Sequence, residues 1–301
     1  MFFSRWAGRL RRRGLDEVPW LFALPAVVAL FAFHFVPIVF GGYYAFTDWD
    51  GLSHASWVGL QNFRRIAGDQ FARSVLWHTL ELATCFVLLV NAIGLALALA
   101  LNRAVKTRNV LRVIFFAPVA LSPLAISFVW QWIFVPQGAL NRVLDAAGLS
   151  SLQRDWLGDP STALWMVLVV MVWQFTGLAM VLYLAGLQQI PEEIEEAALV
   201  DGASDWLRLR KIVLPLLAPA ITVSVTLTFI IGMRVFDQIL GLTGGGPAVG
   251  QTETLGTQIY EQLFQFGRYG YGAAFSVVLT VIVLGLALLQ LIFLRMNERR
   301  L

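Results

Sequence analysis

Six stretches of the chain are long enough to cross a lipid bilayer and contain no charged residue. They are residues 18–47, 82–102, 113–141, 160–191, 212–233 and 269–294. A helix that spans a bilayer needs about 20 apolar residues, so each stretch can hold one. Their apolar centres predict spans at 20–46, 80–101, 112–135, 163–186, 213–235 and 272–294. The sequence therefore predicts an all-α, polytopic membrane protein with six transmembrane helices.

The composition supports this prediction and excludes other classes. Charged residues make up 14% of the 301 residues, whereas a soluble domain carries about 25%. The net charge of +3 does not indicate a nucleic-acid partner, because the basic residues cluster in short segments between the apolar stretches. The only cysteine, Cys85, excludes a disulfide framework and a thiolate metal site.

The distribution of Lys and Arg predicts the orientation. Fifteen of the 22 basic residues fall on the side that holds both termini, six fall on the other side, and Arg234 lies at a span boundary. The positive-inside rule therefore places both termini in the cytoplasm. We expect a cytoplasmic tail at residues 1–19 and one six-span domain at 20–301, with far-side loops at 47–79, 136–162 and 236–271. The uncharged window 238–252 is predicted to be a loop because of its glycines and proline.

One cytoplasmic segment, residues 192–220, is unusually polar for its place between two spans. It holds six acids and three bases. Pro191 suits a first helical position, and the glutamates that follow complement a helix start. Gly202 is placed to end this helix and Ser204 to cap the next one. A helix on a lipid surface usually carries Lys or Arg, whereas the first helix here has four glutamates, so docking to a protein is favoured.

The same segment resembles a known family. Glu196-Ala197-Ala198, three residues, Gly202, nine residues, then Ile212-x-Leu214-Pro215 is similar to the EAA signature of permease subunits of binding-protein-dependent ABC importers. The resemblance implies a type I permease fold in the inner membrane of a prokaryote. It also implies that a cytoplasmic loop at 189–214 couples the spans to a separate ATPase. The implied coupling residues are Glu196, Ala197, Ala198, Asp201, Gly202, Ile212, Leu214 and Pro215.

The partners follow from this resemblance. They are a second permease of the same family, two ATP-binding cassette subunits and an extracytoplasmic solute-binding protein, with lipid around the spans. ATP and Mg²⁺ are expected on the partner ATPase, and this subunit is expected to bind no cofactor. The chain itself has no P-loop and no polar catalytic cluster, and its three histidines are far apart in sequence, so it is predicted to be neither an enzyme nor a metal protein.

Two further stretches resemble the carbohydrate branch of this family, of the maltose and glycerol-3-phosphate type. Residues 234–278, with "FD" followed by a Gly-Gly-Pro loop, are similar to the first permease of the heterodimers, and 24–51 with 57–63 are similar to its first span and external loop. The resemblance implies import of a mono- or oligosaccharide by alternating access. A polyol, glycerol-3-phosphate or a glycerophosphodiester is the alternative cargo. A stand-alone secondary transporter is disfavoured because intramembrane acids are missing apart from Glu81 and Asp237 near span ends.

Polar residues within the spans are candidates for the substrate pathway. A bilayer offers them no water, so they bind either a neighbouring helix or a ligand. Asn91, Gln131, Thr176, Ser224 and Thr226 remain open between these two roles. The family resemblance, taken together with the aromatic and amide side chains of these spans, predicts a substrate pathway. Its lining residues are Ser122, Trp173, Gln174, Thr228, Gly232, Arg234 and Val235. Gly244, Gly245, Gly246 and Pro247 are predicted to form a loop that faces the binding protein or gates the cavity.

Overall fold

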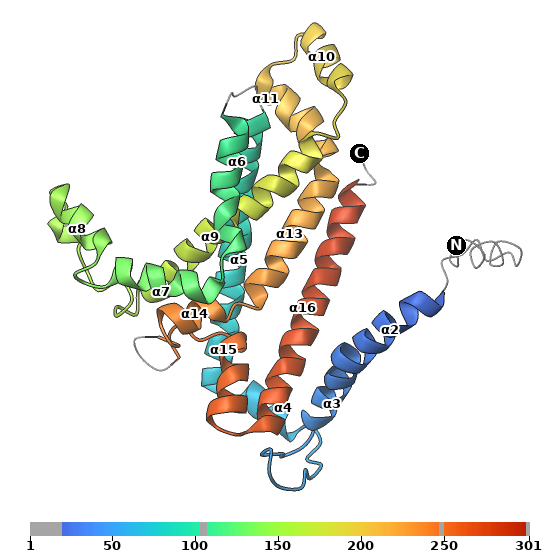
Figure 1. Ribbon diagram of the computed structural model, residues 1–301, viewed down its shortest axis with the longest axis vertical. Helices are drawn as coiled ribbons and strands as arrows, with labels where there is room; N and C mark the ends of the chain where they lie inside the picture. The colour runs from blue at the N-terminus through green and yellow to red at the C-terminus, as the bar shows by residue number, and fades with distance from the viewer. Residues whose placement is uncertain (1–19, 103–106, 247–249, 299–301) are drawn as a thin grey trace, which may run out of the picture.

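The computed structural model describes residues 20–102, 107–246 and 250–298, so the tail predicted at 1–19 lies outside the described residues. Within these ranges every extended regular element is a helix, and the β structure amounts to one isolated bridge between Thr47 and Trp57. The helices form an elongated bundle with two arms that leave it on opposite sides (Figure 1). The prediction of an all-α polytopic fold is confirmed.

Four single helices are long and apolar enough to cross a membrane. They are Ala23–Tyr44, Gln70–Asn102, Ala163–Leu187 and Tyr269–Ile292. Two further pairs of helices pass the same test together but are bent, by 100° between Arg108–Ala120 and Pro123–Ala146 and by 69° between Asp205–Leu216 and Ala218–Met233. The count reaches the predicted six when each bent pair is taken as one span, by length and composition.

The first span forms an arm rather than part of the bundle. It consists of α2 (Trp20–Leu30), a π-helical turn (Phe31–Phe35) and α3 (Val36–Tyr44). Pro37 has no N–H to donate to the preceding turn, and the widened π turn lies directly before it. No residue of the span's apolar window is buried, and α3 meets the bundle through α16. The arm therefore leaves its apolar surface available to lipid or to another subunit.

The second span begins ten residues earlier than predicted. Helix α4 (Gln61–Gly68) and the start of α5 (Gln70–Asn102) occupy most of the far-side segment predicted to be a loop at 47–79. Asp69 separates the two helices and caps the second one, because its Oδ1 accepts from the Phe71 N–H at 2.9 Å. With 33 residues, helix α5 is longer than the roughly 20 residues that a bilayer span needs.

The third span is not the single helix predicted at 112–135. Helix α6 (Arg108–Phe116) continues as a 3₁₀ turn (Ala117–Ala120) and stops, and the chain then turns into α7 (Pro123–Phe134) and α8 (Ala139–Ala146). A residue before proline avoids the helical region, and Leu121 and Ser122 are both extended. Helices α7 and α8 form the second arm (Figure 1). A short 3₁₀ turn, Ser150–Leu152, follows in the segment predicted as a far-side loop.

The fourth span, α9 (Ala163–Leu187), agrees with the prediction, but the fifth is broken. The chain leaves α11 (Asp205–Arg208) through a π turn (Leu209–Val213) and α12 (Leu214–Leu216), then restarts as α13 (Ala218–Met233). Pro215 and Pro219 each remove a helical N–H, which accounts for the 69° bend at Leu217. The fifth span, predicted as one helix at 213–235, is therefore interrupted at Leu217, and Pro215 lies before the bend.

The sixth span, α16 (Tyr269–Glu298), contains the predicted 272–294. The preceding far-side segment is more helical than predicted, because it contains α14 (Asp237–Leu242), α15 (Leu255–Tyr260) and a π turn (Glu261–Gln265). The loop predicted at 238–252 therefore begins after Leu242. Thr254 and Thr257 form a reciprocal capping box at the start of α15.

Helix α5 lies at the centre of the bundle, where it packs against α9 and α13, and α13 packs in turn against α16. Several of these contacts need a residue without a side chain. A Cβ added at Gly177 of α9 would lie 2.1 Å from the backbone oxygen of Phe115 in α6. The bundle therefore holds α6 and α9 in backbone contact, directly beside the break at Leu121.

Candidate functional site

The polar segment forms two short helices at one end of the molecule. Helix α10 (Glu192–Val200) and α11 lie at the end opposite α4 and α15, and the carboxyl end of α16 points the same way (Figure 1). Pro191 is extended and occupies the N-cap of α10, not the first helical position that the sequence predicted. Three of the glutamates lie in the first turn, where the helix dipole favours negative charge.

Gly202 forms the turn between the two helices, as predicted. Its φ of +77° lies in the left-handed region. The N–H of Gly202 donates to the Leu199 oxygen at 3.0 Å, and the N–H of Ala203 donates to the Ala198 oxygen at 2.9 Å. These two bonds complete a Schellman motif, which satisfies the last carbonyls of α10. The Ser204 side chain then caps α11 by accepting from the Leu207 N–H at 3.4 Å.

Arg208 of α11 connects the two helices through Glu195 of α10. Arg208 lies 3.4 Å from Asp205 and 4.0 Å from Glu195 across the turn. Ion pairs that solvent can reach contribute less than about 1 kcal/mol each. The Asp205 pair lies within α11, so only the Glu195 pair bears on the angle between α10 and α11. The i, i+3 spacing of Asp205 and Arg208 indicates the first ion pair in the sequence. No short-range spacing indicates the pair of Arg208 with Glu195.

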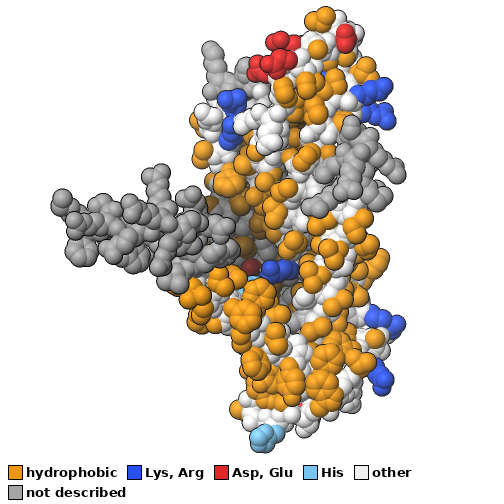
Figure 2. Space-filling model, turned by 90° about the vertical axis from the view of Figure 1, so that its right-hand side faces the viewer, with side chains coloured by type: hydrophobic (Ala, Val, Ile, Leu, Met, Phe, Trp, Pro, Cys, Tyr) orange, Lys and Arg blue, Asp and Glu red, His pale blue; other side chains and the backbone are white. Residues whose placement is uncertain are grey.

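The end of this helical pair combines acids with exposed apolar side chains. Val200 is 88% exposed, and Leu199 and Trp206 are also exposed. Acidic side chains gather at the same end of the molecule in the space-filling view (Figure 2). Of the predicted coupling residues here, Ala198 is buried, while Glu196, Ala197, Asp201 and Gly202 are exposed. An apolar strip beside carboxylates is suited to a protein partner rather than to anionic lipid.

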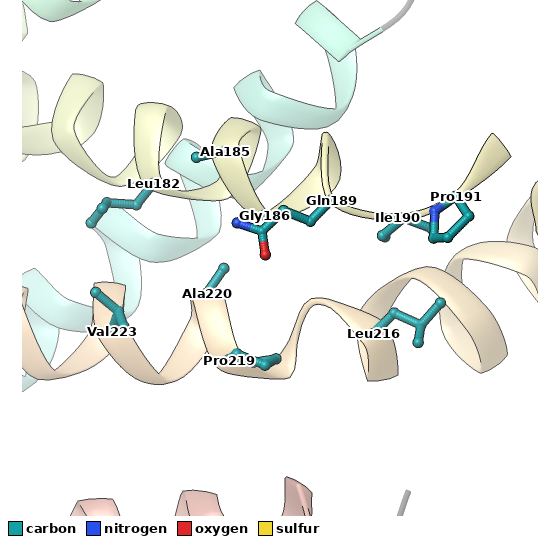
Figure 3. Close-up of a pocket in the computed structure, with 10 residues that line it drawn as sticks. All are labelled: Leu182, Ala185, Gly186, Gln189, Ile190, Pro191, Leu216, Pro219, Ala220 and Val223. Atoms are coloured by element: carbon teal, nitrogen blue, oxygen red, sulfur yellow. The ribbon is translucent and has the colours of Figure 1, made fainter.

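The remaining predicted coupling residues lie where the helical pair joins the membrane bundle. Ile212 is in the π turn, and Leu214 and Pro215 are in α12, all half-buried. Beside them an apolar groove of about 370 Å³ separates the end of α9 from α12 and α13. Gln189 reaches into this groove, opposite Pro219 and Ala220 (Figure 3). The groove lies beside the 69° bend, whose residue Leu217 is buried against Gly186 of α9.

A buried polar network ties α5, α9 and α13 together in mid-bundle. Asn91 Nδ2 donates to Thr228 Oγ1 at 2.9 Å, and Asn91 Oδ1 accepts from Tyr183 at 2.6 Å and from Ser224 at 2.7 Å. Thr228 also donates to the Ser224 backbone oxygen at 2.8 Å. Because each member has partners within the network, Asn91, Ser224 and Thr228 act in helix packing in this structure. Tyr183, which the sequence reading did not single out, completes it.

The structure separates the predicted pathway residues into two groups. Gln174, Thr228, Gly232 and Val235 are buried, whereas Trp173, Ser122 and Arg234 are exposed. Gln174 donates to the Leu121 oxygen at 3.2 Å and accepts from Gln238 at 3.1 Å, so it fixes the break in the third span. A Cβ at Gly232 would lie 3.0 Å from the Phe86 ring, which indicates tight packing on α5.

Trp173 lies on an accessible part of α9 and is paired with a second tryptophan. The ring centroids of Trp173 and Trp130 are 5.4 Å apart in an edge-to-face arrangement. Trp173 is 44% exposed. A partly exposed aromatic pair, formed by α9 and by the helix α7 that follows the break at Ser122, has the chemistry that stacks against the C–H face of a sugar ring. Its role in a pathway stays a prediction.

The predicted binding-protein loop is only partly described. Gly244, Gly245 and Gly246 have φ values of +59°, +105° and +131°, which only glycine adopts readily. Pro247 lies outside the described residues. Just after the loop, Glu253 is buried beside Gln258 and Glu261. The sequence reading did not single out this acid cluster. In the described ranges, no group of three or more His, Cys, Asp and Glu side chains could hold a metal ion.

The arrangement as a whole is that of a membrane transport subunit: an apolar helical bundle with two broken spans and a capped polar helix pair at one end. Residues 91–301 match the model of the family described as "binding-protein-dependent transport system inner membrane component". The chain belongs to this family. It is therefore a permease subunit rather than an enzyme, it resides in the inner membrane, and its transport system depends on a binding protein.

Named relatives agree over nearly the full length. A trehalose/maltose transport system permease protein from Thermococcus litoralis is 33% identical over 278 residues, 91% of this chain and 92% of the relative. A multiple sugar-binding transport system permease protein from Streptococcus mutans is 32% identical over 273 residues, 90% of this chain and 93% of the relative. A chain of a bacterial ABC transporter involved in alginate import aligns over 99% of both chains with a TM-score of 0.81 at 23% identity, which shows the shared fold.

Proposed function

We propose that the chain forms half of the pathway of an ATP-driven importer that carries a carbohydrate across the inner membrane by alternating access. The observation that carries this proposal is the helical pair α10–α11, whose Gly202 turn and exposed apolar strip lie at the end of a bundle with two bent spans. The names of the relatives, which refer to trehalose, maltose and multiple sugars, support a carbohydrate cargo.

The assembly that this function requires has four further kinds of partner. They are a second permease, two ATP-binding cassette subunits, the solute-binding protein and the carbohydrate itself. ATP and Mg²⁺ belong to the cassette subunits, and this chain binds neither. In this proposal the strip on α10 docks on a cassette subunit through the predicted coupling residues. Closure of the cassettes then moves the spans through the bend at Leu217.

The test of this function is uptake by proteoliposomes that contain all of the subunits, with ATP on the cassette side and the binding protein on the other. We expect uptake of a labelled oligosaccharide that depends on both ATP and the binding protein. Glycerol-3-phosphate, a glycerophosphodiester and a polyol serve as competing cargoes in the same assay. Uptake without ATP, driven by an ion gradient, would contradict the proposal.

The orientation proposed from the basic residues places both termini and α10 in the cytoplasm. Leu52 and Val200 are 96% and 88% exposed and belong to segments at opposite ends of the molecule, which makes them a matched pair. In a Cys85→Ser background, an impermeant thiol reagent should label Leu52→Cys in intact cells. It should label Val200→Cys only after permeabilisation. The reverse labelling pattern would show that the topology is the opposite of the one proposed.

Trp173→Ala is expected to weaken uptake without unfolding the subunit. Because Trp173 is not fully buried, its truncation costs less than that of a fully buried Trp, and in a chain of this length the melting temperature should change by only a few degrees. The loss of a stacking surface should raise the KM for the sugar about tenfold, equivalent to ~1.4 kcal/mol. Trp132→Ala, at an even more exposed tryptophan on α7, is the control and should leave KM unchanged. An unchanged KM in the Trp173 variant would remove this residue from the pathway.

A further inference from the structure

The strongest feature that the transport function leaves unused is an arginine of α6 whose charged edge has no partner. Arg112 is half-buried, and its Nε and Nη2 are both buried without a hydrogen-bond partner. These two nitrogens form one edge of the guanidinium, which can donate two parallel hydrogen bonds to a carboxylate or a phosphate. Within the described ranges Arg112 forms no ion pair. This edge is therefore suited to an anion that the described part of the chain does not supply.

The two helices that pack against α6 offer it no acid. Helix α6 packs on α9 and also touches α5. The end of α9 that runs beside it, residues 177–187, has one polar side chain, Tyr183, which donates to Asn91. The last part of α5, residues 91–102, has no charged side chain. These stretches therefore contain no carboxylate that could pair with Arg112.

Arg112 lies close to one end of the bundle. Gly177 of α9 lies against the backbone of Phe115, three residues after Arg112. At about 1.5 Å per residue, Arg112 is about 5 Å nearer than Phe115 to the end of the bundle that carries α10 (Figure 1). It is then about 10 Å inside the end of α9 at Leu187. From this depth a long basic side chain reaches the headgroup region of a bilayer.

The surface of α6 around Arg112 changes from polar to apolar within one turn. Arg108 and Asn109, on the turn before it, are exposed. Val113 and Phe116, on the turn after it, are 68% and 38% exposed. Because residues three and four apart are neighbours on a helix, these five side chains form one continuous surface, the α6 strip. A positively charged end followed by an apolar end matches a phospholipid, in which a phosphate is followed by acyl chains.

We propose that the α6 strip binds one anionic phospholipid. Arg112 turns its unpartnered edge to two phosphate oxygens, Arg108 adds a second positive charge, and the acyl chains follow the apolar end of the strip. A carboxylate of another subunit would satisfy Arg112 but would leave Val113 and Phe116 uncovered. The leaflet that supplies the lipid, which is the inner one, rests on the proposed orientation of the chain, but the binding site does not.

The charge of the strip decides which phospholipids it selects. Helix α6 contains two arginines and no acid. Phosphatidylglycerol has a net negative charge, whereas phosphatidylcholine carries a cationic group beside its phosphate, which the arginines repel. The strip should therefore prefer anionic headgroups. A free phosphate ion offers the same oxygens, but nothing to cover the apolar end of the strip.

Native mass spectrometry of the purified full-length chain, titrated with phosphatidylglycerol in detergent, measures this binding. Arg112→Gln should raise the Kd of the first bound lipid about tenfold, because a charge and two hydrogen bonds are lost. Arg112→Lys keeps the charge but not the planar edge, so a rise of about threefold is expected. Arg64→Gln, at an exposed arginine of α4 at the opposite end of the molecule, is the control and should leave the Kd unchanged. An unchanged Kd in Arg112→Gln would overturn the proposal.

Three competitors in the same titration separate a phospholipid from other occupants. Phosphatidylcholine should bind about tenfold more weakly than phosphatidylglycerol, and equal binding would remove the role of charge. Inorganic phosphate should not displace the lipid, and displacement would show a site for a free anion instead. The second permease should leave the lipid bound. Release of the lipid by that subunit would assign Arg112 to a protein carboxylate and overturn the proposal.

The melting temperature gives a second measurement, which also applies if Arg112→Gln does not fold. Arg108 is exposed, so Arg108→Gln removes charge from the strip without disturbing the packing of α6. Phosphatidylglycerol should raise the melting temperature of the wild type more than that of Arg108→Gln, since a ligand stabilises the folded state according to its affinity. Equal increases in both proteins would overturn the lipid site. These measurements need neither ATP nor a cargo, so their failure is distinct from a failure of the transport proposal.

Discussion

Gly202→Pro is expected to abolish ATP-driven uptake while the subunit still inserts and assembles. Proline fixes φ near −65° and has no N–H, whereas Gly202 has a φ of +77° and donates to the Leu199 oxygen. The Schellman turn therefore cannot form, at a cost of about 3 kcal/mol or more. Because Gly202 is exposed and a Cβ there meets no other atom within 4 Å, the loss should affect coupling and not folding.

Gly202→Asn is the matched control for this prediction. Asparagine is the side chain that best tolerates the left-handed region, and a Cβ at Gly202 meets no atom within 4 Å. This variant should keep most of the uptake. The measurements are uptake and ATP hydrolysis in proteoliposomes, with assembly followed by co-purification of the cassette subunits. Normal uptake by the proline variant would show that this turn does not transmit motion.

A second pair of glycine substitutions should change stability in opposite directions. Gly177→Ala would put a methyl group 2.1 Å from the Phe115 backbone oxygen, and backbone cannot rotate away, so α6 and α9 must separate. We expect a loss of about 1–3 kcal/mol. Gly285→Ala, in the middle of α16 with open space around its Cβ, should be neutral or more stable by up to about 1 kcal/mol.

The melting temperatures of the two alanine variants in one detergent measure this difference. The comparison is controlled because both glycines lie inside long apolar helices and the substitution is the same. Equal shifts for the two variants would mean that α6 and α9 are not in backbone contact in the folded subunit. An intact subunit with lower uptake in Gly177→Ala alone would place the contact in the conformational change instead.

The existence of the spans could be predicted from sequence, but their course could not. The length of the uncharged stretches predicted where α9 and α16 begin to within a few residues, because these helices contain no interior proline near the membrane centre. The same criterion predicted α6 and α7 as one continuous span, and α12 and α13 as another. Pro123 and Pro219 were visible as signals of a break, yet hydrophobicity does not tell whether a chain continues or turns by 100° after a proline.

Local chemistry predicted the candidate site where partners are close in sequence. Gly202 and Ser204 were identified because a helix end and a helix start use characteristic residues within a few positions. The network around Asn91 was not predicted from sequence, because Asn91 and Thr228 are 137 residues apart and meet only when α5 packs on α13. The cluster around Glu253 was missed for a different reason: its residues belong to a segment that was expected to be largely loop.

Helix α9 is the one straight span that contacts both breaks and also leads into the polar helix pair. Only Gln188 to Pro191 separate it from α10, and its Gln174 fixes the carbonyl of Leu121 at the other break. Near its end, Gly186 lies against Ala220, just past the bend at Leu217. In the proposed coupling, a displacement of α10 would therefore reach both breaks through one helix, because α9 contacts the Leu121 carbonyl at one break and Ala220 beside the other.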